Sequence, residues 1–326
     1  MALAQKTTRV VGLPGVDNKG TRSKALIALG LVSFFWGTTW IASREGVRYM
    51  PALQLAAIRQ FIGGIAYVIF FVSKGRPFPK GKEWLTVLML TFLNFILSNT
   101  LSTWGLKYIT GGLGSIIGAT FPLWLVVILL LKSKSSLPRK AIIGFMLGFT
   151  GICVIFYEHL RDFLQPAFRF GILLSVSASI SWAFGTLYTK KKASDFNAYF
   201  SLGLQMVISA LVLYLISWTA GVTIPLQEIP TRSWIAIFYL VIFSSIVTFV
   251  AYVYALQHLP ASRVSIYAYL NPVVAVLIGS LFFGEKFSMY IGIGGLITLL
   301  GVYLVNEAFR KKIPETAEEE LERRDD

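Results

Sequence analysis

The sequence predicts an all-α integral membrane protein of ten transmembrane helices, arranged as two inverted five-helix repeats. The 326 residues are 55% hydrophobic and 14% charged, with a mean hydropathy of +0.67, whereas soluble domains carry about 25% charged residues. Apolar windows long enough to cross a hydrocarbon core of about 30 Å recur along almost the whole chain. No alternating strand pattern accompanies them, and helices satisfy their own backbone hydrogen bonds in lipid.

Hydropathy, together with Gly, Pro and charged residues between the apolar runs, places the ten spans in order. They lie at about 24–43, 51–73, 84–106, 110–131, 139–157, 170–189, 196–219, 232–256, 260–283 and 287–308. Residues 1–23 are polar and lack the apolar core of a signal peptide. We expect a cytoplasmic N-terminal tail at 1–23, a first repeat at 24–157, a linker at 158–169, a second repeat at 170–308 and a charged cytoplasmic tail at 309–326.

An internal repeat without gaps relates the two halves at an offset of 150 residues. Its matched identities pair Leu106, Ser115, Ile116, Pro122, Gly144 and Gly151 with Leu256, Ser265, Ile266, Pro272, Gly294 and Gly301. Near an offset of 148, Gly37 and Thr38 fall on Gly185 and Thr186. Because each half holds five spans, the second half must enter the membrane from the opposite side. Coincidence among glycine-rich apolar helices is the alternative explanation.

Three parts of the chain resemble the EamA-type branch of the drug/metabolite transporter superfamily. They are FWGTTW at 35–40, Arg59 early in the second span, and 255–305 with ALQHLPASRVS, LNPVVAVLIGSLFFGE and GGLITLLGVYLV. The resemblance covers about residues 24–308. It implies ten helices in two inverted repeats, a central cavity and export of metabolites or amphipathic compounds, including amino acids in some members. The first half departs from the Gly284–Glu285 turn, with Lys134 and Ser135 at the same offset, a turn that we interpret as structural.

Polar stripes mark the third, eighth and ninth spans as candidate cavity walls. Residues four apart share one helical face. The stripe of the third span is Asn94, Ser98 and Ser102, and its repeat partners in the eighth span are Ser244, Thr248 and Tyr252. The stripe of the ninth span is Arg263, Tyr267 and Asn271. In lipid such faces point inward, either toward a wet cavity or toward a partner helix that they join by hydrogen bonds. Arg263 also fits the cytoplasmic headgroup region, whereas Tyr267 and Asn271 lie deeper.

Four further positions complete the candidate site. Arg59 lies roughly 12 Å beyond Pro51 at 1.5 Å per residue, and it either holds a substrate carboxylate or clamps backbone carbonyls together with Gln60. We expect a cavity for flat or amphipathic solutes to be lined by Trp36, Thr38 and Trp182. For the two tryptophans, the alternative is a place in the aromatic belts at the membrane interfaces.

Two prolines within predicted spans are candidate hinges. Pro122 and Pro272 occupy equivalent positions in the two halves. Each proline frees a carbonyl near the midplane, where the binding sites of inverted-repeat carriers tend to lie.

Composition and residue pattern argue against several other functions, of which a passive channel and a membrane-embedded enzyme are the alternatives to a carrier. The net charge is +14, but the basic residues lie in short clusters between spans, so we expect no nucleic-acid partner. One cysteine, Cys153, and two histidines provide no metal cluster, and we expect no cofactor. No acidic or nucleophilic cluster supports an enzyme, and no rings of like residues support a passive channel.

The remaining interpretation is a carrier, with a small-molecule substrate and the lipid bilayer as its partners. Amino acids or amphipathic compounds suit the few cations of the predicted spans. Nucleotide sugars or sugar phosphates are the alternative substrates, although they usually need a denser basic lining.

Basic residues predict the orientation in a bacterial inner, or plasma, membrane. Twenty Lys and Arg lie on one side and seven on the other, namely Arg44, Arg48, Lys107, Arg161, Arg169, Arg232 and Lys286. By the positive-inside rule both termini are cytoplasmic.

Cysteines at Ser23 and Arg310, with Cys153 removed, should therefore resist an impermeant thiol reagent in intact cells and react after permeabilisation. Labelling from outside would show the orientation to be reversed.

Overall fold

The computed structural model describes residues 19–121, 123–124, 127–128, 138–158, 160–192, 197–259 and 267–310. These residues form helices and their connections, without a strand. Seven of the helices are long and apolar enough to cross a membrane, and shorter apolar helices follow at 267–283 and 289–305. The all-helical membrane fold is therefore confirmed. The fourth predicted span, 110–131, lies partly outside the described residues.

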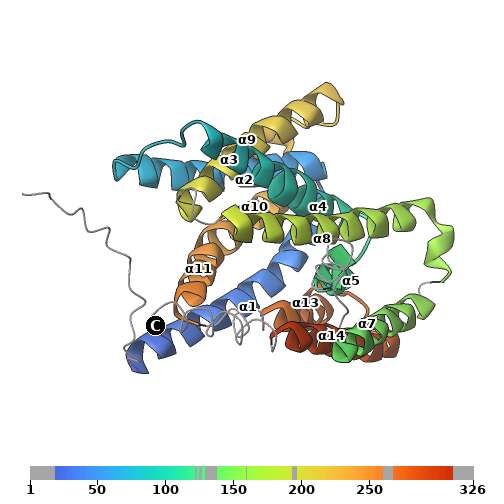
Figure 1. Ribbon diagram of the computed structural model, residues 1–326. Helices are drawn as coiled ribbons and strands as arrows, with labels where there is room; N and C mark the ends of the chain where they lie inside the picture. The colour runs from blue at the N-terminus through green and yellow to red at the C-terminus, as the bar shows by residue number, and fades with distance from the viewer. Residues whose placement is uncertain are drawn as a thin grey trace, which may run out of the picture.

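The helices of the two halves follow one another in the same order (Figure 1). The first half holds α1 (Lys19–Val47), α2 (Ala52–Ser73), α3 (Lys82–Leu90), η1 (Thr91–Asn99), α4 (Thr100–Gly105), α5 (Gly111–Gly118) and α7 (Arg139–Glu158). After the turn η2 (Asp162–Leu164), the second half holds α8 (Pro166–Lys192), α9 (Ala198–Thr219), η3 (Leu226–Glu228), α10 (Thr231–Tyr239), η4 (Leu240–Val247), α11 (Thr248–His258), α13 (Tyr267–Phe283) and α14 (Met289–Arg310).

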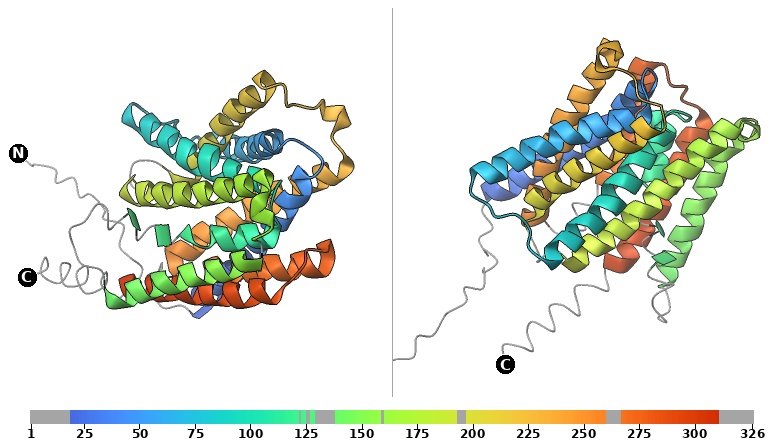
Figure 2. Two further views of the ribbon diagram at one scale, coloured as in Figure 1. Left: turned by 90° about the vertical axis from the view of Figure 1, so that its right-hand side faces the viewer. Right: turned by 90° about the horizontal axis from the view of Figure 1, so that it is seen from above.

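Two helix pairs, α2 with α9 and α7 with α14, join equivalent helices of the two halves (Figure 2). Glycines let their backbones meet. A Cβ at Gly144 of α7 would lie 2.7 Å from the Gly301 carbonyl oxygen of α14, and one at Gly64 of α2 would lie 2.9 Å from the Gly203 carbonyl of α9. Since lipid tails are as apolar as leucine, close packing of small residues is a main source of helix association in membranes.

The glycines of α5 have a different use from the helix-to-helix approach that their spacing suggests. A Cβ at Gly118 would lie 2.6 Å from the Trp40 ring, and one at Gly114 would meet Leu106 at the same distance. This glycine face of α5 therefore accommodates two side chains, one of them the Trp40 indole.

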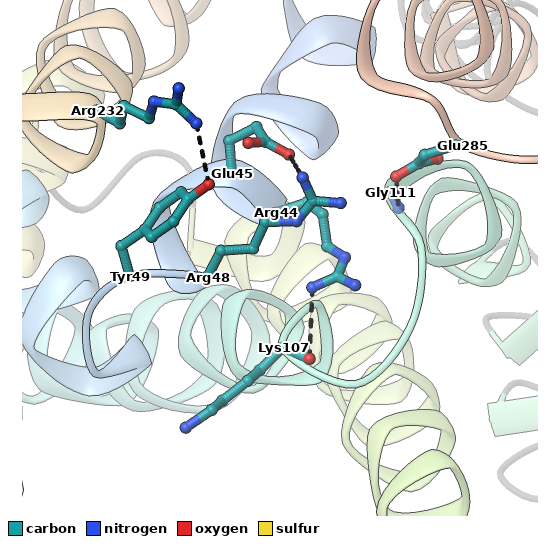
Figure 3. Close-up of polar contacts among 8 residues, drawn as sticks. All are labelled: Arg44, Glu45, Arg48, Tyr49, Lys107, Gly111, Arg232 and Glu285. Carbon is teal, nitrogen blue, oxygen red and sulfur yellow. Dashed lines mark hydrogen bonds and ion pairs between the residues drawn. The ribbon is translucent and has the colours of Figure 1, made fainter.

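A carboxylate from the second half caps a helix of the first (Figure 3). Glu285 accepts hydrogen bonds from the backbone nitrogens of Gly111 at 2.7 Å and Gly112 at 3.0 Å, where α5 begins. Gly284 has a φ of 65°, a conformation that favours glycine, and it turns the chain out of α13. A carboxylate at a helix N-terminus satisfies free N–H groups and complements the helix dipole. The turn is thus a structural link between the halves, as the sequence predicts.

Replacing Gly144 by alanine should destabilise the protein, because its methyl group has to displace the α14 backbone. Overpacking of this kind costs about 1–3 kcal/mol. We expect a lower melting temperature of the detergent-purified protein. Gly30→Ala is the matched control, since a Cβ there meets nothing within 4 Å. Equal melting temperatures for the two variants would show that the α7–α14 contact does not hold the halves together.

Candidate functional site

A cavity of about 200 Å³ lies between helices of both halves. Its walls come from α1, α2, η1, α4 and α5 of the first half and from α8, η4, α11 and α13 of the second. Arg59 is the only charged residue among the described lining residues. The volume is below the roughly 300–1,000 Å³ of pockets for drug-sized ligands, so the cavity suits a small solute.

Two π-helical segments, η1 and η4, carry polar residues to this cavity. Each is followed by a threonine whose hydroxyl donates to the carbonyl five residues earlier, Thr100 to Phe95 at 2.8 Å and Thr248 to Phe243. These equivalent bonds are 148 residues apart, so the offset of 150 pairs the polar stripes of the third and eighth spans two residues out of register. π-Helical segments are rare and occur frequently at functional sites.

The structure brings eight of the predicted site residues to the cavity wall: Trp36, Arg59, Asn94, Ser98, Trp182, Ser244, Tyr267 and Asn271. They come from α1, α2, η1, α8, η4 and α13. Ser102, the last member of the first polar stripe, also lines the cavity. For that stripe the geometry therefore favours the cavity wall over the alternative of hydrogen bonds that join two helices. Substrate binding by these residues stays a prediction.

Thr38, Thr248 and Tyr252 are not among the lining residues. The Thr38 hydroxyl lies 2.6 Å from the Tyr239 hydroxyl and so joins α1 to α10. Thr248 is fully buried, and its hydroxyl donates to the Phe243 carbonyl of the preceding segment η4. The Tyr252 ring packs against Trp36, with 5.2 Å between ring centroids. All three side chains support the packing around the cavity.

The predicted hinge residues are only partly covered by the structure. Pro122 lies outside the described residues, as does Arg263 of the ninth-span stripe. Pro272 lies inside α13, which continues through it to Phe283. Because proline has no N–H, the Ala268 carbonyl lacks its usual donor, and Ala268 lines the cavity. The hinge role stays a prediction.

Asn271 ties α13 to α1 beside the cavity. With its amide nitrogen oriented toward two carbonyl groups, the side chain donates to Ser33 at 2.9 Å and to Tyr267 at 3.0 Å. Close approach of the two helices depends on Gly37, where a Cβ would lie 2.6 Å from the Val274 side chain. The two helices thus form one wall of the cavity.

Arg59 is buried, with a relative exposure of 4%, and its guanidinium donates to one amide side chain, that of Asn99. Its Nη2 donates to Oδ1 of Asn99, and Nε2 of Gln60 donates to the same oxygen at 3.3 Å. Within the described residues Arg59 forms no ion pair and bonds to no backbone carbonyl, which the clamp alternative requires. Its Nε has no partner there either.

Aromatic rings form another part of the wall. The Trp36 ring meets Phe249 edge-on at 5.3 Å between centroids and Tyr267 at 5.0 Å. Phe121 also lines the cavity. Edge-to-face geometry is favourable between rings. The cavity therefore presents a cation with amides in one region and apolar ring surfaces in another.

Asn99, Ser175 and Ser179 are lining residues that the sequence analysis missed. Asn99 directly follows Ser98, so α-helical spacing of four residues does not place both on one face. In the wider turn of the π-helix η1, both residues reach the cavity. Ser175 and Ser179 share a face of α8 with Trp182, a helical spacing that was available in the sequence.

Gly185 of α8, the repeat partner of Gly37, leaves room for the Asn94 side chain at the cavity wall. A Cβ at Gly185 would collide with Asn94 Oδ1. The glycine therefore allows Asn94 to lie flat against α8.

Comparison with known proteins places this arrangement among membrane transporters. The model of the EamA-like transporter family matches the chain twice, over residues 23–157 and 169–307. These two matches confirm the predicted fold of ten helices in two inverted repeats. A solved crystal structure superposes with a TM-score of 0.61 and 16% identity, covering 87% of this chain and 97% of that one, and shows the fold alone.

Curated relatives extend over most of the chain. The uncharacterized transporter YvbV of Bacillus subtilis is 28% identical over 295 residues, covering 87% of this chain and 92% of that protein. The uncharacterized inner membrane transporter YedA of Escherichia coli K12 is 29% identical, covering 81% and 83%. The WAT1-related protein At3g02690 of Arabidopsis thaliana, described as chloroplastic, is 28% identical, covering 84% and 67%.

Introduced cysteines should distinguish the cavity wall from the surrounding packing. Cys153 is exposed and must first be replaced by serine. We expect Ser98→Cys and Ser102→Cys to react with a small polar thiol reagent, because both positions line the cavity. Thr248→Cys should stay protected, since Thr248 is fully buried outside it. Equal reaction rates at all three positions would contradict this placement.

Proposed function

This chain belongs to the EamA-like transporter family and is a multi-pass membrane transporter, and on that premise we propose that it exports small organic metabolites. Its substrates are amino acids or amphipathic compounds. Transport proceeds by alternating access, in which one five-helix half rocks against the other around the cavity. The setting is a bacterial inner membrane with both termini cytoplasmic; the Escherichia coli relative is named as an inner membrane transporter.

The observation that carries this proposal is the position of the cavity between helices of both halves. Any rocking of the halves changes the walls on both sides of a bound solute. In the α2–α9 and α7–α14 pairs the glycine backbones of the two halves meet directly, so these pairs are the contacts about which the halves would move. Interfaces and packed cores switch between discrete arrangements, so small shifts are amplified into gating.

Other functions find less support in the lining. Nucleotide sugars or sugar phosphates carry several negative charges, whereas one cation lines the described cavity. A channel needs a continuous polar pore, and packed aromatic rings occupy part of this wall. Among the described residues no three His, Cys, Asp or Glu side chains gather as a hydrolytic or metal site would need.

Flux in liposomes tests the proposal. Purified protein should move members of a metabolite panel with saturation and trans-stimulation, measured with and without a proton gradient. Ser98→Phe should abolish flux by filling the cavity, whereas Leu88→Phe on the lipid-exposed side of the same span should not, because Leu88 is 48% exposed. Flux that does not saturate, or that survives in Ser98→Phe with an intact fold, would contradict a carrier working through this cavity.

A further inference from the structure

Arg59 is a buried cation whose counter-charge is not supplied by the described residues. It is 4% exposed, lines the cavity and leaves its Nε without a partner there. No carboxylate lies among the described lining residues. Charged side chains are almost never fully buried unless paired, and an isolated buried charge is strongly unfavourable. The arrangement calls for an anion brought by the ligand.

The side chains around Arg59 orient its guanidinium without neutralising it. Asn99 Oδ1 accepts from both Arg59 and Gln60, which fixes the planar group at the end of a neutral amide. A guanidinium held in this way can offer its remaining N–H groups to a carboxylate in paired, charge-assisted hydrogen bonds. Asn94 also lines the cavity as a neutral group. An ammonium group would find polar neighbours here but no anionic partner.

The aromatic wall adds a second requirement. Trp36, Phe249 and Tyr267 line the same cavity, and Trp36 packs against each of the other two rings, so they present ring surfaces rather than charges. Such surfaces favour a flat apolar group of the ligand, which contributes both buried area and ring contacts. The volume of about 200 Å³ leaves space for one such group.

The polar cluster drawn in Figure 3 holds four cationic residues, Arg44, Arg48, Lys107 and Arg232, and two carboxylates, Glu45 and Glu285. Ser43 and Leu106 line the cavity, and their chain neighbours Arg44 and Lys107 meet through an Arg44 hydrogen bond to the Lys107 carbonyl. Arg48, paired with Glu45 at 2.5 Å, lies beside Arg44 in the same cluster. An excess of one sign near a cavity raises the local concentration of the opposite charge.

We infer that the cavity binds a small organic carboxylate of net negative charge with one aromatic or flat apolar group. Its carboxylate lies on Arg59 and its apolar group lies against Trp36 and Phe249. This inference rests on the proposed function and narrows its substrate class, since a zwitterion brings an ammonium group for which the described lining has no anion.

Four probes that differ by one group test the inference in the purified full-length protein. They are 3-phenylpropionate, its neutral amide 3-phenylpropanamide, the zwitterion phenylalanine, and propionate, which lacks the ring. Isothermal titration calorimetry in detergent should show 3-phenylpropionate binding at least tenfold more tightly than each of the other three. Because the comparison uses one unaltered protein, it does not depend on the folding of a variant.

Variants then assign the preference to residues. Arg59→Gln should bind 3-phenylpropionate and its amide equally, and Arg59→Lys should keep a reduced preference for the anion. Phe249→Ala should weaken the carboxylate and the amide by the same factor, because the ring contact is common to both. Arg76→Gln is the matched control, since Arg76 is exposed beyond the end of α2 and lies outside the described lining, and it should leave the selectivity unchanged.

Equal binding of the carboxylate and its amide by the unaltered protein would overturn the inference, as would tighter binding of phenylalanine. Anion selectivity that persists in a folded Arg59→Gln variant would overturn it too. Liposome flux separates these results from the proposed function. Flux of phenylalanine without binding of the carboxylate would sink the ligand class and leave transport standing, whereas Arg59-dependent binding without flux of any probe would support the ligand class and count against transport.

Discussion

Close backbone contact between equivalent helices holds the two halves of this protein together. In lipid, apolar side chains gain little by leaving their surroundings for a neighbouring helix, so association depends on how closely backbones approach. Gly144 and Gly301 in the α7–α14 pair, and Gly64 and Gly203 in the α2–α9 pair, provide that approach. Most of the other helices lie between these two pairs (Figure 1), and they supply most of the cavity wall. A larger side chain at these contacts would separate the halves and alter every wall that they share.

The symmetry of the frame contrasts with the asymmetry of what it encloses. Thr100 and Thr248 end the two π-helical segments with the same hydrogen bond, yet the cation that lines the cavity comes from α2 of the first half. Phe249 and Tyr267 come from the second half, and Trp36 packs between them. Duplication thus explains the scaffold, while divergence after duplication explains a cavity that can orient a ligand with two different ends.

The sequence predicted the scaffold well, because hydropathy, odd-numbered halves and matched glycines are properties of the chain itself. It also identified Arg59, Asn94 and Ser98, since polar groups within an apolar span must face inward. Asn99 escaped because its place on the wall depends on a π-helical turn, which neither composition nor α-helical spacing reveals. The eighth span was paired two residues out of register for a related reason. The sequence could not reveal that Thr38 joins two helices, because its partner, Tyr239, is distant in sequence.

The proposed ligand site is one asymmetric cavity between the halves, in which the negative charge of the ligand lies on Arg59. The most direct measurement is a crystal structure of the protein with a bromine-labelled 3-phenylpropionate, in which anomalous scattering locates the bromine. We expect a bromine peak beside Trp36 and Phe249 and the carboxylate within hydrogen-bonding distance of Arg59. A peak on the lipid-facing surface, with Arg59 still bonded to Asn99 and no ligand in the cavity, would contradict this site.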